Sequence, residues 1–372
     1  MPEIVLKNVT KKFGKFTAVE NLNLVIADGS FVTLLGPSGC GKTTTLRMIA
    51  GLESPTEGEI FIGGKPVYSS VNGIDISPAK RDVGFLFQNY ALWPHMTVEQ
   101  NIGFGLENLK WDKQKIKQRV DELLAMLKIG AFGKRYPSEL SGGQQQRVAI
   151  ARTLATGPKV LFMDEPLSNL DAKLRTEMRS ELKRLHAETD STFVYVTHDQ
   201  LEAMTLSTRT CLMKEGIVQQ YAPPLEIYNE PVNLFAADFV GSPTMNFIEV
   251  TGKQQNNGGA ELLAGALDIV FTPVSGKLAF NDGQELTLGV RPEFIRISDS
   301  GSIPAKTYAA LPSGMETIVK IRLGDLILTS VVFGAIDFRP DTDIRIDFIG
   351  DNCILFDRES GVNLGLGRAA IR

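Results

Sequence analysis

The feature that most constrains this chain is a glycine-rich loop placed between a buried strand and a helix. Phe31–Leu35 is a short apolar run, typical of a strand covered on both faces, and Gly36-Pro-Ser-Gly-Cys-Gly-Lys42-Thr43 follows it directly. This run matches the phosphate-loop pattern G-x-x-x-x-G-K-[ST], and we expect a helix from about Lys42 to Ala50 after it. Glycines let successive backbone N–H groups turn toward phosphates, and a helix N-terminus adds a favourable dipole. The sequence therefore predicts a nucleotide site.

The loop residues divide the binding of the phosphates among them. We expect Lys42 to bridge the β- and γ-phosphates and the Thr43 hydroxyl to hold Mg²⁺. The predicted contacts to the nucleotide are Gly36, Ser38, Gly39, Cys40, Gly41, Lys42, Thr43 and Thr44.

Strand-like and helix-like patterns alternate on both sides of this loop. Apolar runs resemble buried strands at Val83–Phe87, Val160–Met163 and Thr192–Val196. Helical periodicity occupies the stretches from Thr97 to about Leu127, from Gly143 to about Leu154, and from Leu174 to Leu185. Such alternation predicts an α/β domain with a mostly parallel sheet.

The character of the chain changes near Gly241-Ser-Pro243. Short β-like runs punctuated by glycine follow, at Asn256–Gly259, Asp282-Gly283, Ser313-Gly314 and Gly334. We expect a first domain over residues 1–239 and a separate all-β domain of barrel type over residues 240–372.

Two acids end the apolar run Val160–Met163. Asp164 is expected to hold magnesium through water, and Glu165 to polarise the water that attacks the γ-phosphate. Taken alone, two acids at a strand end are more often a solvated pair or a helix cap. The phosphate loop upstream favours the nucleotide site.

A second glycine-rich helix start lies at Leu140-Ser-Gly-Gly-Gln-Gln-Gln-Arg147. Ser141, Gly142 and Gly143 open a helix and so form a second anion-binding N-terminus. This stretch resembles the signature motif of ATP-binding cassette (ABC) proteins. The resemblance implies that Ser141, Gly142, Gly143 and Gln144 of one subunit close over ATP held by the phosphate loop of another.

The other landmarks of ABC ATPases follow in the family's order. The resemblance implies that Gln88 contacts magnesium together with Thr43 and Asp164, and that His198 contacts the γ-phosphate. It assigns Ser168-Asn-Leu-Asp171 to a loop crossing the dimer interface, and residues of about 89–155 to a helical subdomain. Phe13 fits the aromatic residue that stacks on adenine, with Phe16 nearby.

The C-terminal part narrows the resemblance further. Pro224–Phe247 resembles the hinge of the ATPase subunits of carbohydrate importers, and Gly289-Val-Arg-Pro-Glu293 resembles the marker of their oligonucleotide/oligosaccharide-binding (OB)-like regulatory domain. Thr208 and Ala222 depart from the family's usual aspartate and glycine. The resemblance implies import of sugars, whereas polyamine, glycerol-phosphate and inorganic-ion importers carry similar cassettes. It also implies pairing with itself or a similar ATPase, two membrane permeases and, indirectly, an external solute-binding protein.

Composition excludes some classes and leaves others open. A net charge of −4 gives no electrostatic reason to expect nucleic acid, although a cassette ATPase of translation or repair is an alternative. A phosphate-loop kinase is a further alternative, against which the signature motif and Glu165 argue. Three scattered cysteines fit a reducing compartment, and no apolar run reaches the ~18 residues of a membrane span. We therefore expect a cytoplasmic protein on the inner face of the membrane.

Overall fold

The computed structural model describes residues 2–256, 258–265 and 267–371, which form two compact units, Met1–Pro224 and Leu225–Arg372. Asn257, in the glycine-containing stretch Asn256–Gly259, lies outside the described residues. The strands of the first unit are β1 (Ile4–Phe13), β2 (Phe16–Ile26), β3 (Phe31–Leu35), β4 (Glu57–Ile62), β5 (Lys65–Ser69), β6 (Ile74–Asp75), β7 (Val83–Leu86), β8 (Val160–Asp164), β9 (Thr192–Thr197), β10 (Arg209–Lys214) and β11 (Ile217–Ala222). Its helices are α1 (Lys42–Ala50), α2 (Val98–Asn108), α3 (Lys113–Met126), α4 (Gly142–Ala155), α5 (Ala172–Glu188) and α6 (Gln200–Leu206).

The central sheet confirms the expected α/β fold. Its strand order is β11-β10-β3-β9-β8-β7, and every neighbouring pair from β10 to β7 is parallel. The carboxyl ends of parallel strands lie at one edge of a sheet, where α/β proteins bind their ligands. This edge therefore receives the loops that follow β3, β7, β8 and β9.

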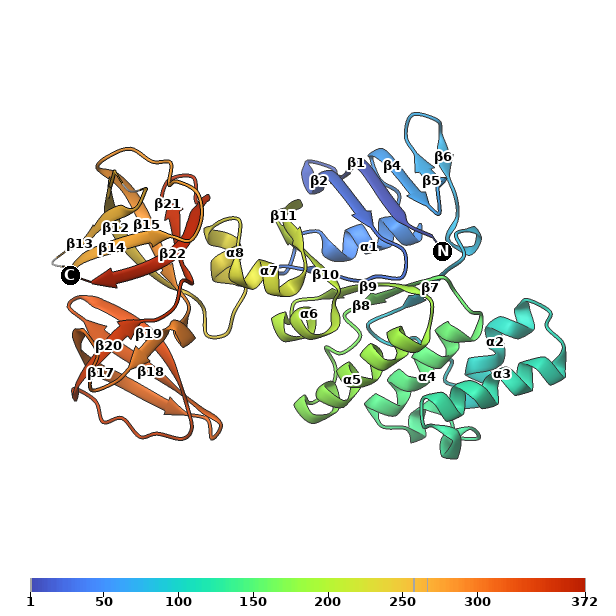
Figure 1. Ribbon diagram of the computed structural model, residues 1–372. Coiled ribbons are helices and arrows are strands. Elements are labelled where there is room, and N and C mark those ends of the chain that lie inside the picture. The colour runs from blue at the N-terminus through green and yellow to red at the C-terminus, as the bar shows by residue number, and fades with distance from the viewer. Residues whose placement is uncertain (1, 257, 266, 372) are drawn as a thin grey trace. The chain divides into compact units, whose positions relative to one another are not determined.

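Different layers cover the two faces of this sheet (Figure 1). On one face α1 packs between the parallel sheet and a second, antiparallel sheet in the order β2-β1-β4-β5-β6. On the other face lie α2 to α6, whose buried side chains meet Phe193 and Tyr195 of β9. Alternate residues of β9 thus point into two separate cores, which explains its unbroken apolar character.

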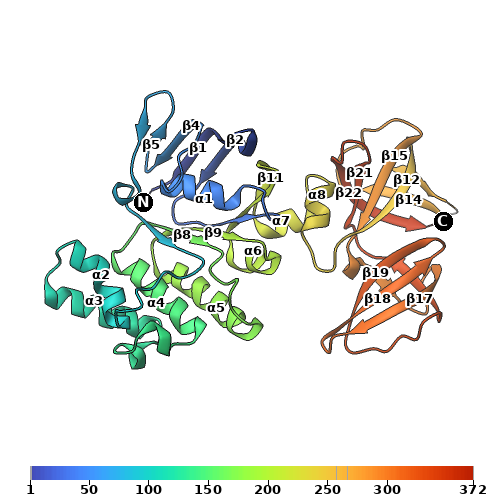
Figure 2. The same ribbon diagram turned by 180° about the vertical axis from the view of Figure 1, so that it is seen from behind.

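The expected helical subdomain divides differently from the sequence pattern. The single pattern from Thr97 to Leu127 becomes two helices, because Asp112 caps α3 through the N–H groups of Gln114 and Lys115. Figure 2 shows α2 and α3 side by side at the margin of the unit, and Val120, Leu123 and other apolar residues of α3 are buried there.

Arg81 follows a short 3-10 turn, Pro78–Lys80, near the end of α1. The Arg81 guanidinium is buried and donates to the carbonyl oxygens of Met48 and Ile49, both at 2.9 Å. Arg81 thereby satisfies carbonyls at the end of α1, where no further helical turn follows.

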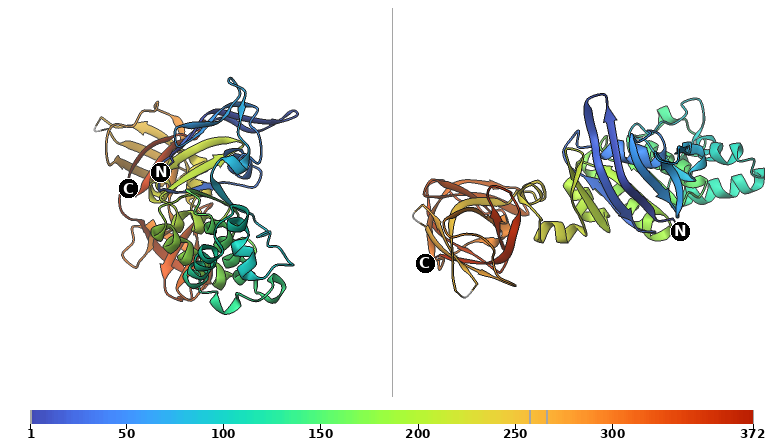
Figure 3. Two further views of the ribbon diagram at one scale, coloured as in Figure 1. Left: turned by 90° about the vertical axis from the view of Figure 1, so that its right-hand side faces the viewer. Right: turned by 90° about the horizontal axis from the view of Figure 1, so that it is seen from above.

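The second unit is all-β apart from its first helices and one 3-10 turn, Pro292–Phe294. Its elements are α7 (Pro224–Asn229), α8 (Leu234–Phe239), β12 (Asn246–Gln254), β13 (Ala260–Ala264), β14 (Leu267–Pro273), β15 (Gln284–Val290), β16 (Ile295–Ile297), β17 (Ile303–Pro312), β18 (Glu316–Leu323), β19 (Leu326–Phe333), β20 (Asp343–Phe348), β21 (Cys353–Asp357) and β22 (Asn363–Ile371). Strands β12-β13-β14-β22-β21-β15 close into a barrel, and β16-β20-β17-β18-β19 form a sheet (Figure 3).

The helix α8 packs with the barrel. Ala237 is buried with Met245, Ile354 and Phe356. Residues 225–239 therefore group with the second unit, whereas the sequence placed the domain boundary after residue 239. Among the described residues, no helix is both long enough and apolar enough to cross a membrane.

Candidate functional site

The phosphate loop needs glycine for two separate reasons. Gly41 has φ +98°, and a Cβ there would lie 2.5 Å from the Ala18 carbonyl oxygen of β2. Gly39 has φ +82° with open space around it, so only its backbone conformation requires glycine. Gly41 is also the N-cap of α1, and no described side chain caps that helix. The N–H groups of its first turn therefore face the loop without a side-chain partner, as a phosphate site requires.

Lys42 is folded across the loop that contains it. Its side chain is buried, and Nζ donates to the carbonyl oxygens of Gly36 and Pro37, both at 2.8 Å. Cys40 Sγ lies 3.7 Å from the same ammonium, and burial raises the pKa of that thiol. The ammonium is thus held by neutral oxygens inside the loop, a short distance along its own flexible stem from any phosphate bound there.

Thr43 and Asp164 are brought together from positions 121 residues apart. The Thr43 hydroxyl donates to Asp164 Oδ1 at 2.9 Å, and Arg47 Nη2 lies 3.4 Å from Asp164 Oδ2. Burial raises the pKa of Asp164, opposed by the Thr43 hydrogen bond and the Arg47 charge. A hydroxyl and a buried carboxylate at the phosphate loop are the oxygen ligands that Mg²⁺ prefers, so the residues fit that ion.

Glu165 and His198 follow neighbouring strands and meet at the sheet edge. His198 Nδ1 lies 3.2 Å from Glu165 Oε2, and the Glu165 N–H donates to the Val196 carbonyl of β9 at 3.1 Å. Glu165 has φ +44°, a conformation that non-glycine residues adopt rarely and often at functional sites. The arrangement places a carboxylate and an imidazole where water could be polarised.

Gln88 lies in this region, but its contacts are with the loop Ser168–Asp171, which we call the dimer loop. Gln88 Nε2 donates to Ser168 Oγ at 3.3 Å, and Asn169 Nδ2 donates to the Gln88 carbonyl at 3.2 Å. Asp171 caps α5 by accepting from Leu174 N at 3.0 Å. The structure therefore joins Gln88 to the dimer loop, whereas it joins Thr43 to Asp164.

The signature residues form a capped helix start. Ser141 and Gln144 make reciprocal side-chain contacts to each other's backbone N–H groups, at 3.4 Å and 2.9 Å. Ser141 and Gly142 are exposed, so they are accessible to another molecule. Gly143 is buried, and a Cβ there would lie 2.5 Å from Leu174 Cδ2, so tight packing against α5 explains this glycine.

The candidate adenine contact lies at the end of the β1–β2 hairpin. Phe13 pairs with Phe16 across the turn, and Lys11 Nζ lies 4.7 Å from the centroid of the Phe13 ring. Phe13 is 47% exposed and Phe16 is 60% exposed. Strand β2 then leads to Ala18, which abuts Gly41, so the hairpin connects both exposed rings to the phosphate loop.

Three charged residues near the site are absent from the sequence-based set. Arg47 pairs with Asp164, and Arg175 of α5 and Glu202 of α6 approach each other beside the dimer loop. Asp199 is the N-cap of α6, and aspartate after an apolar strand is a residue type that marks such a helix start. No sequence pattern separates a buried Glu202 from an ordinary exposed acid in a first helical turn.

Comparisons with known proteins agree with this geometry. A family profile described as "ABC transporter" matches residues 19–168, and one described as "MalK OB fold domain" matches residues 241–295. The trehalose/maltose import ATP-binding protein MalK of Thermococcus litoralis is 42% identical over 97% of this chain and 99% of its own. The sn-glycerol-3-phosphate import ATP-binding protein UgpC of Escherichia coli is also 42% identical, again over 97% of this chain and 99% of its own.

A solved structure supports the same assignment for the first unit. The ATP-binding cassette MJ0796, in a dimeric post-hydrolysis state bound to ADP and Pi, is 36% identical with a TM-score of 0.52, over 59% of this chain and 98% of its own. The chain therefore belongs to the family of ABC transporter ATP-binding proteins, in the group that includes MalK and UgpC, and it is an ATPase.

Proposed function

We propose that this ATPase is one of two ATP-hydrolysing subunits of a membrane importer for sugars or related carbohydrates, bound at the inner face of the membrane. The observation that carries the proposal is similarity along 97% of the chain to import subunits, extending through the OB-fold match at residues 241–295. Phosphoryl transfer from ATP needs positioning and charge neutralisation more than covalent chemistry, and the site supplies both.

The residues at the sheet edge divide the work of hydrolysis. The backbone N–H groups of the phosphate loop hold the phosphates, and Lys42 turns its ammonium from the loop carbonyls to the β- and γ-phosphates. Thr43, Asp164 and Gln88 would hold Mg²⁺, which would supply positive charge that offsets the negative charge of the phosphates. Glu165 polarises the attacking water, and His198, 3.2 Å from its carboxylate, orients that carboxylate and contacts the γ-phosphate.

The active unit is a dimer in which each ATP is shared. The exposed N-terminus of α4, with Ser141 and Gly142, would close over the γ-phosphate held by the other subunit's phosphate loop. The dimer loop, which Gln88 contacts, would lie across the same interface. Closure by ATP and opening after hydrolysis form a hinge-type switch that can drive transport.

The segment Asn89–His95 is suited to receive a permease. Arg152 of α4 donates to the carbonyls of Tyr90 and Ala91. The side-chain amide of Asn101 on α2 accepts from the Trp93 N–H and donates to the Trp93 carbonyl. These bonds hold an irregular loop in one conformation and leave Trp93 42% exposed. A preorganised loop with an exposed aromatic anchor is typical of a protein-binding surface.

The cargo is chosen by the permeases and by an external solute-binding protein. MalK, named for trehalose/maltose import, and UgpC, named for sn-glycerol-3-phosphate import, share the same sequence identity with this chain, 42%. The match to the MalK OB-fold domain supports a sugar as the cargo. Uptake of labelled maltose, trehalose and sn-glycerol 3-phosphate should be compared in cells with and without the gene. We expect disaccharide uptake to depend on it; dependence of sn-glycerol 3-phosphate alone would contradict the sugar proposal.

The decisive test of the mechanism is Glu165→Gln. The amide keeps the shape of the side chain but cannot accept a proton from water, so the rate of ATP hydrolysis should fall by about 10²–10⁴ while ATP binding is retained. Sedimentation with ATP should then detect a closed dimer that persists because it cannot hydrolyse its nucleotide. Hydrolysis at the wild-type rate would show that Glu165 does not activate water.

A mixing experiment tests whether the two sites are shared between subunits. Lys42→Ala removes a charge-assisted contact to phosphate, and Ser141→Arg blocks closure over the partner's nucleotide. Each variant alone should be inactive. A mixed dimer regains one intact site, so partial activity is expected, and a mixture as inactive as its components would count against two independently active shared sites.

A further inference from the structure

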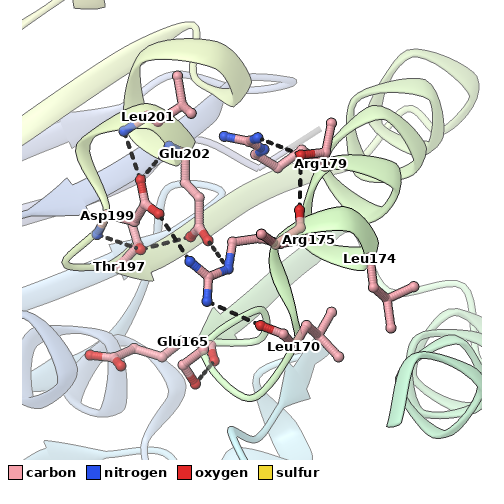
Figure 4. Close-up of polar contacts among 12 residues, drawn as sticks. Glu165, Leu170, Leu174, Arg175, Arg179, Thr197, Asp199, Leu201 and Glu202 are labelled. Atoms are coloured by element: carbon pink, nitrogen blue, oxygen red, sulfur yellow. Dashed lines mark hydrogen bonds and ion pairs between the residues drawn. The ribbon is translucent and has the colours of Figure 1, made fainter. Parts of the chain in front are cut away.

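A cluster of charged side chains lies beside the catalytic residues and belongs to none of the sequence motifs above. It consists of Arg175 on α5 and of Asp199 and Glu202 at the start of α6 (Figure 4). Arg175 bridges two segments that contain functional residues. One is the dimer loop, and the other is the stretch Thr197–Glu202, which contains His198 and which we call the switch segment.

The Arg175 guanidinium contacts both segments at once. Its Nη2 donates to the Leu170 carbonyl of the dimer loop at 3.1 Å. Its Nη1 donates to Asp199 Oδ2 at 3.5 Å, and its Nε lies 4.0 Å from Glu202 Oε1. Because a guanidinium is a rigid planar fork, a shift of one segment changes the contacts to the other.

The switch segment is itself tied to the sheet by Glu202. Its side chain is buried, and Oε2 accepts from Tyr195 OH and from Thr197 Oγ1, both at 2.7 Å. Burial raises the pKa of Glu202, the two hydroxyl donors and the Arg175 charge oppose that rise, and Asp199 adds to it. A buried carboxylate beside a second carboxylate needs a nearby cation, so displacing Arg175 is costly.

Asp199 is adjacent to His198 and fixes the backbone around it. Its Oδ1 accepts from Leu201 N and Glu202 N, and its own N–H donates to Thr197 Oγ1. His198 therefore lies in a short segment in which the carboxylate of the next residue, Asp199, accepts a hydrogen bond from Arg175. The His198 side chain in turn lies 3.2 Å from the Glu165 carboxylate.

We propose that Arg175 is a positioning residue that couples the dimer loop to His198, so that closure of the two subunits sets the geometry for hydrolysis. The proposal rests on the shared-site ATPase dimer proposed above. A partner subunit that presses on the dimer loop moves the Leu170 carbonyl, and the guanidinium passes that movement to Asp199 and to the backbone of His198. ATP then becomes hydrolysable when the dimer is closed.

The test compares Arg175→Gln with Arg179→Gln in the full-length chain. Arg179 lies one turn further along α5 and donates to Thr176 Oγ1, on its own helix. Arg175→Gln should lower kcat by about 10-fold, with the KM for ATP unchanged within about two-fold, because orientation of the reacting groups is lost while binding is not. ATP-dependent dimerisation should persist. Arg179→Gln should hydrolyse ATP like the wild type.

Two further variants separate positioning from simple stabilisation. Arg175→Lys keeps the charge but cannot reach both segments, so it should recover only part of kcat. Asp199→Asn keeps the helix cap, since asparagine caps as well as aspartate, and should lower kcat as Arg175→Gln does. If both act through one contact, the double variant should be no slower than the slower single variant.

Three results would overturn the proposal. The first is a wild-type kcat for Arg175→Gln. The second is a parallel loss of thermal stability, nucleotide affinity and ATP-dependent dimer, which a merely structural arginine would cause. The third is multiplication of the two single effects in the double variant. If the proposed shared-site dimer is itself wrong, the wild-type chain will hydrolyse ATP without any ATP-dependent association. That result is distinct from the three above, and it would remove the basis for assigning this role to Arg175.

Discussion

Arg291, in the run Gly289–Glu293, holds the second unit together in a way that can be measured. Its side chain is 2% exposed, and its guanidinium donates to three carbonyl oxygens: those of Ala237 and Val240 through Nη1 and that of Tyr228 through Nη2. The guanidinium also lies 4.0 Å from the centroid of the Tyr228 ring. One side chain thus fastens the segment of α7 and α8 to the barrel.

Replacing Arg291 with methionine should destabilise this unit strongly. Hydrogen bonds to charged groups contribute about 1.5–3 kcal/mol each, so three of them represent a gross loss of about 5–9 kcal/mol. Relief of the buried charge and packing of the methionine stem offset part of this loss, which leaves about 3–5 kcal/mol. For a unit of this size the melting temperature should fall by about 10–15 °C.

The two units can be followed separately in a denaturation experiment. The chain has two tryptophans, Trp93 and Trp111, and both lie in the first unit, so their fluorescence reports on that unit. Hydrogen exchange at α8 reports on the second. Arg291→Met should accelerate exchange at α8 while the tryptophan transition and ATP hydrolysis stay unchanged.

Arg296→Met is the matched control. Arg296 lies in the same unit, its side chain is 59% exposed, and its ion pair with Asp347 is 3.8 Å long. This change should alter stability by less than about 0.5 kcal/mol. The reasoning is refuted if Arg291→Met and Arg296→Met change hydrogen exchange at α8 by the same factor. It is also refuted if Arg291→Met destabilises the first unit, seen in the tryptophan transition, as much as it destabilises the second.

Three further predictions concern the phosphate loop and the division of the chain. Gly41→Ala adds both left-handed backbone strain and a clash with the Ala18 carbonyl, so the affinity for ATP, measured by titration with a fluorescent nucleotide, should fall by about 10-fold or more. Gly39→Ala adds the strain alone and should lose less affinity. Equal losses of affinity would contradict the steric argument. We expect the second unit to hold two cassettes together when no nucleotide is bound. A chain ending at Pro224 should therefore keep ATP binding but sediment as a monomer without nucleotide. A nucleotide-free dimer as tight as that of the full chain would disprove this role of the second unit. A chain ending at Val240 should be less soluble, since it exposes the face of α8 that packs on the barrel.

Where contiguous residues carry the chemistry, their order along the chain is enough to predict it. A phosphate loop works through its own backbone and the helix that follows, so the glycines from Gly36 to Gly41 and the Lys42-Thr43 pair predict the site without a partner. The same holds for the capped helix start at Ser141, which the structure places on α4. Alternating apolar runs and helical periods likewise predicted the parallel sheet, because burial on both faces leaves a local pattern.

Which distant side chains meet depends on the folded chain. Nothing local distinguishes buried Arg81 and Arg291, or half-buried Arg175, from exposed arginines. The carbonyls and carboxylates that compensate their charge lie elsewhere in the chain. The place of α8 in the second unit also depends on distant contacts, because its apolar face is buried against barrel residues such as Ile354 and Phe356. Local hydrogen bonds and periodicity can be read from neighbouring residues, whereas the pairing of buried charges depends on contacts that only the folded chain creates.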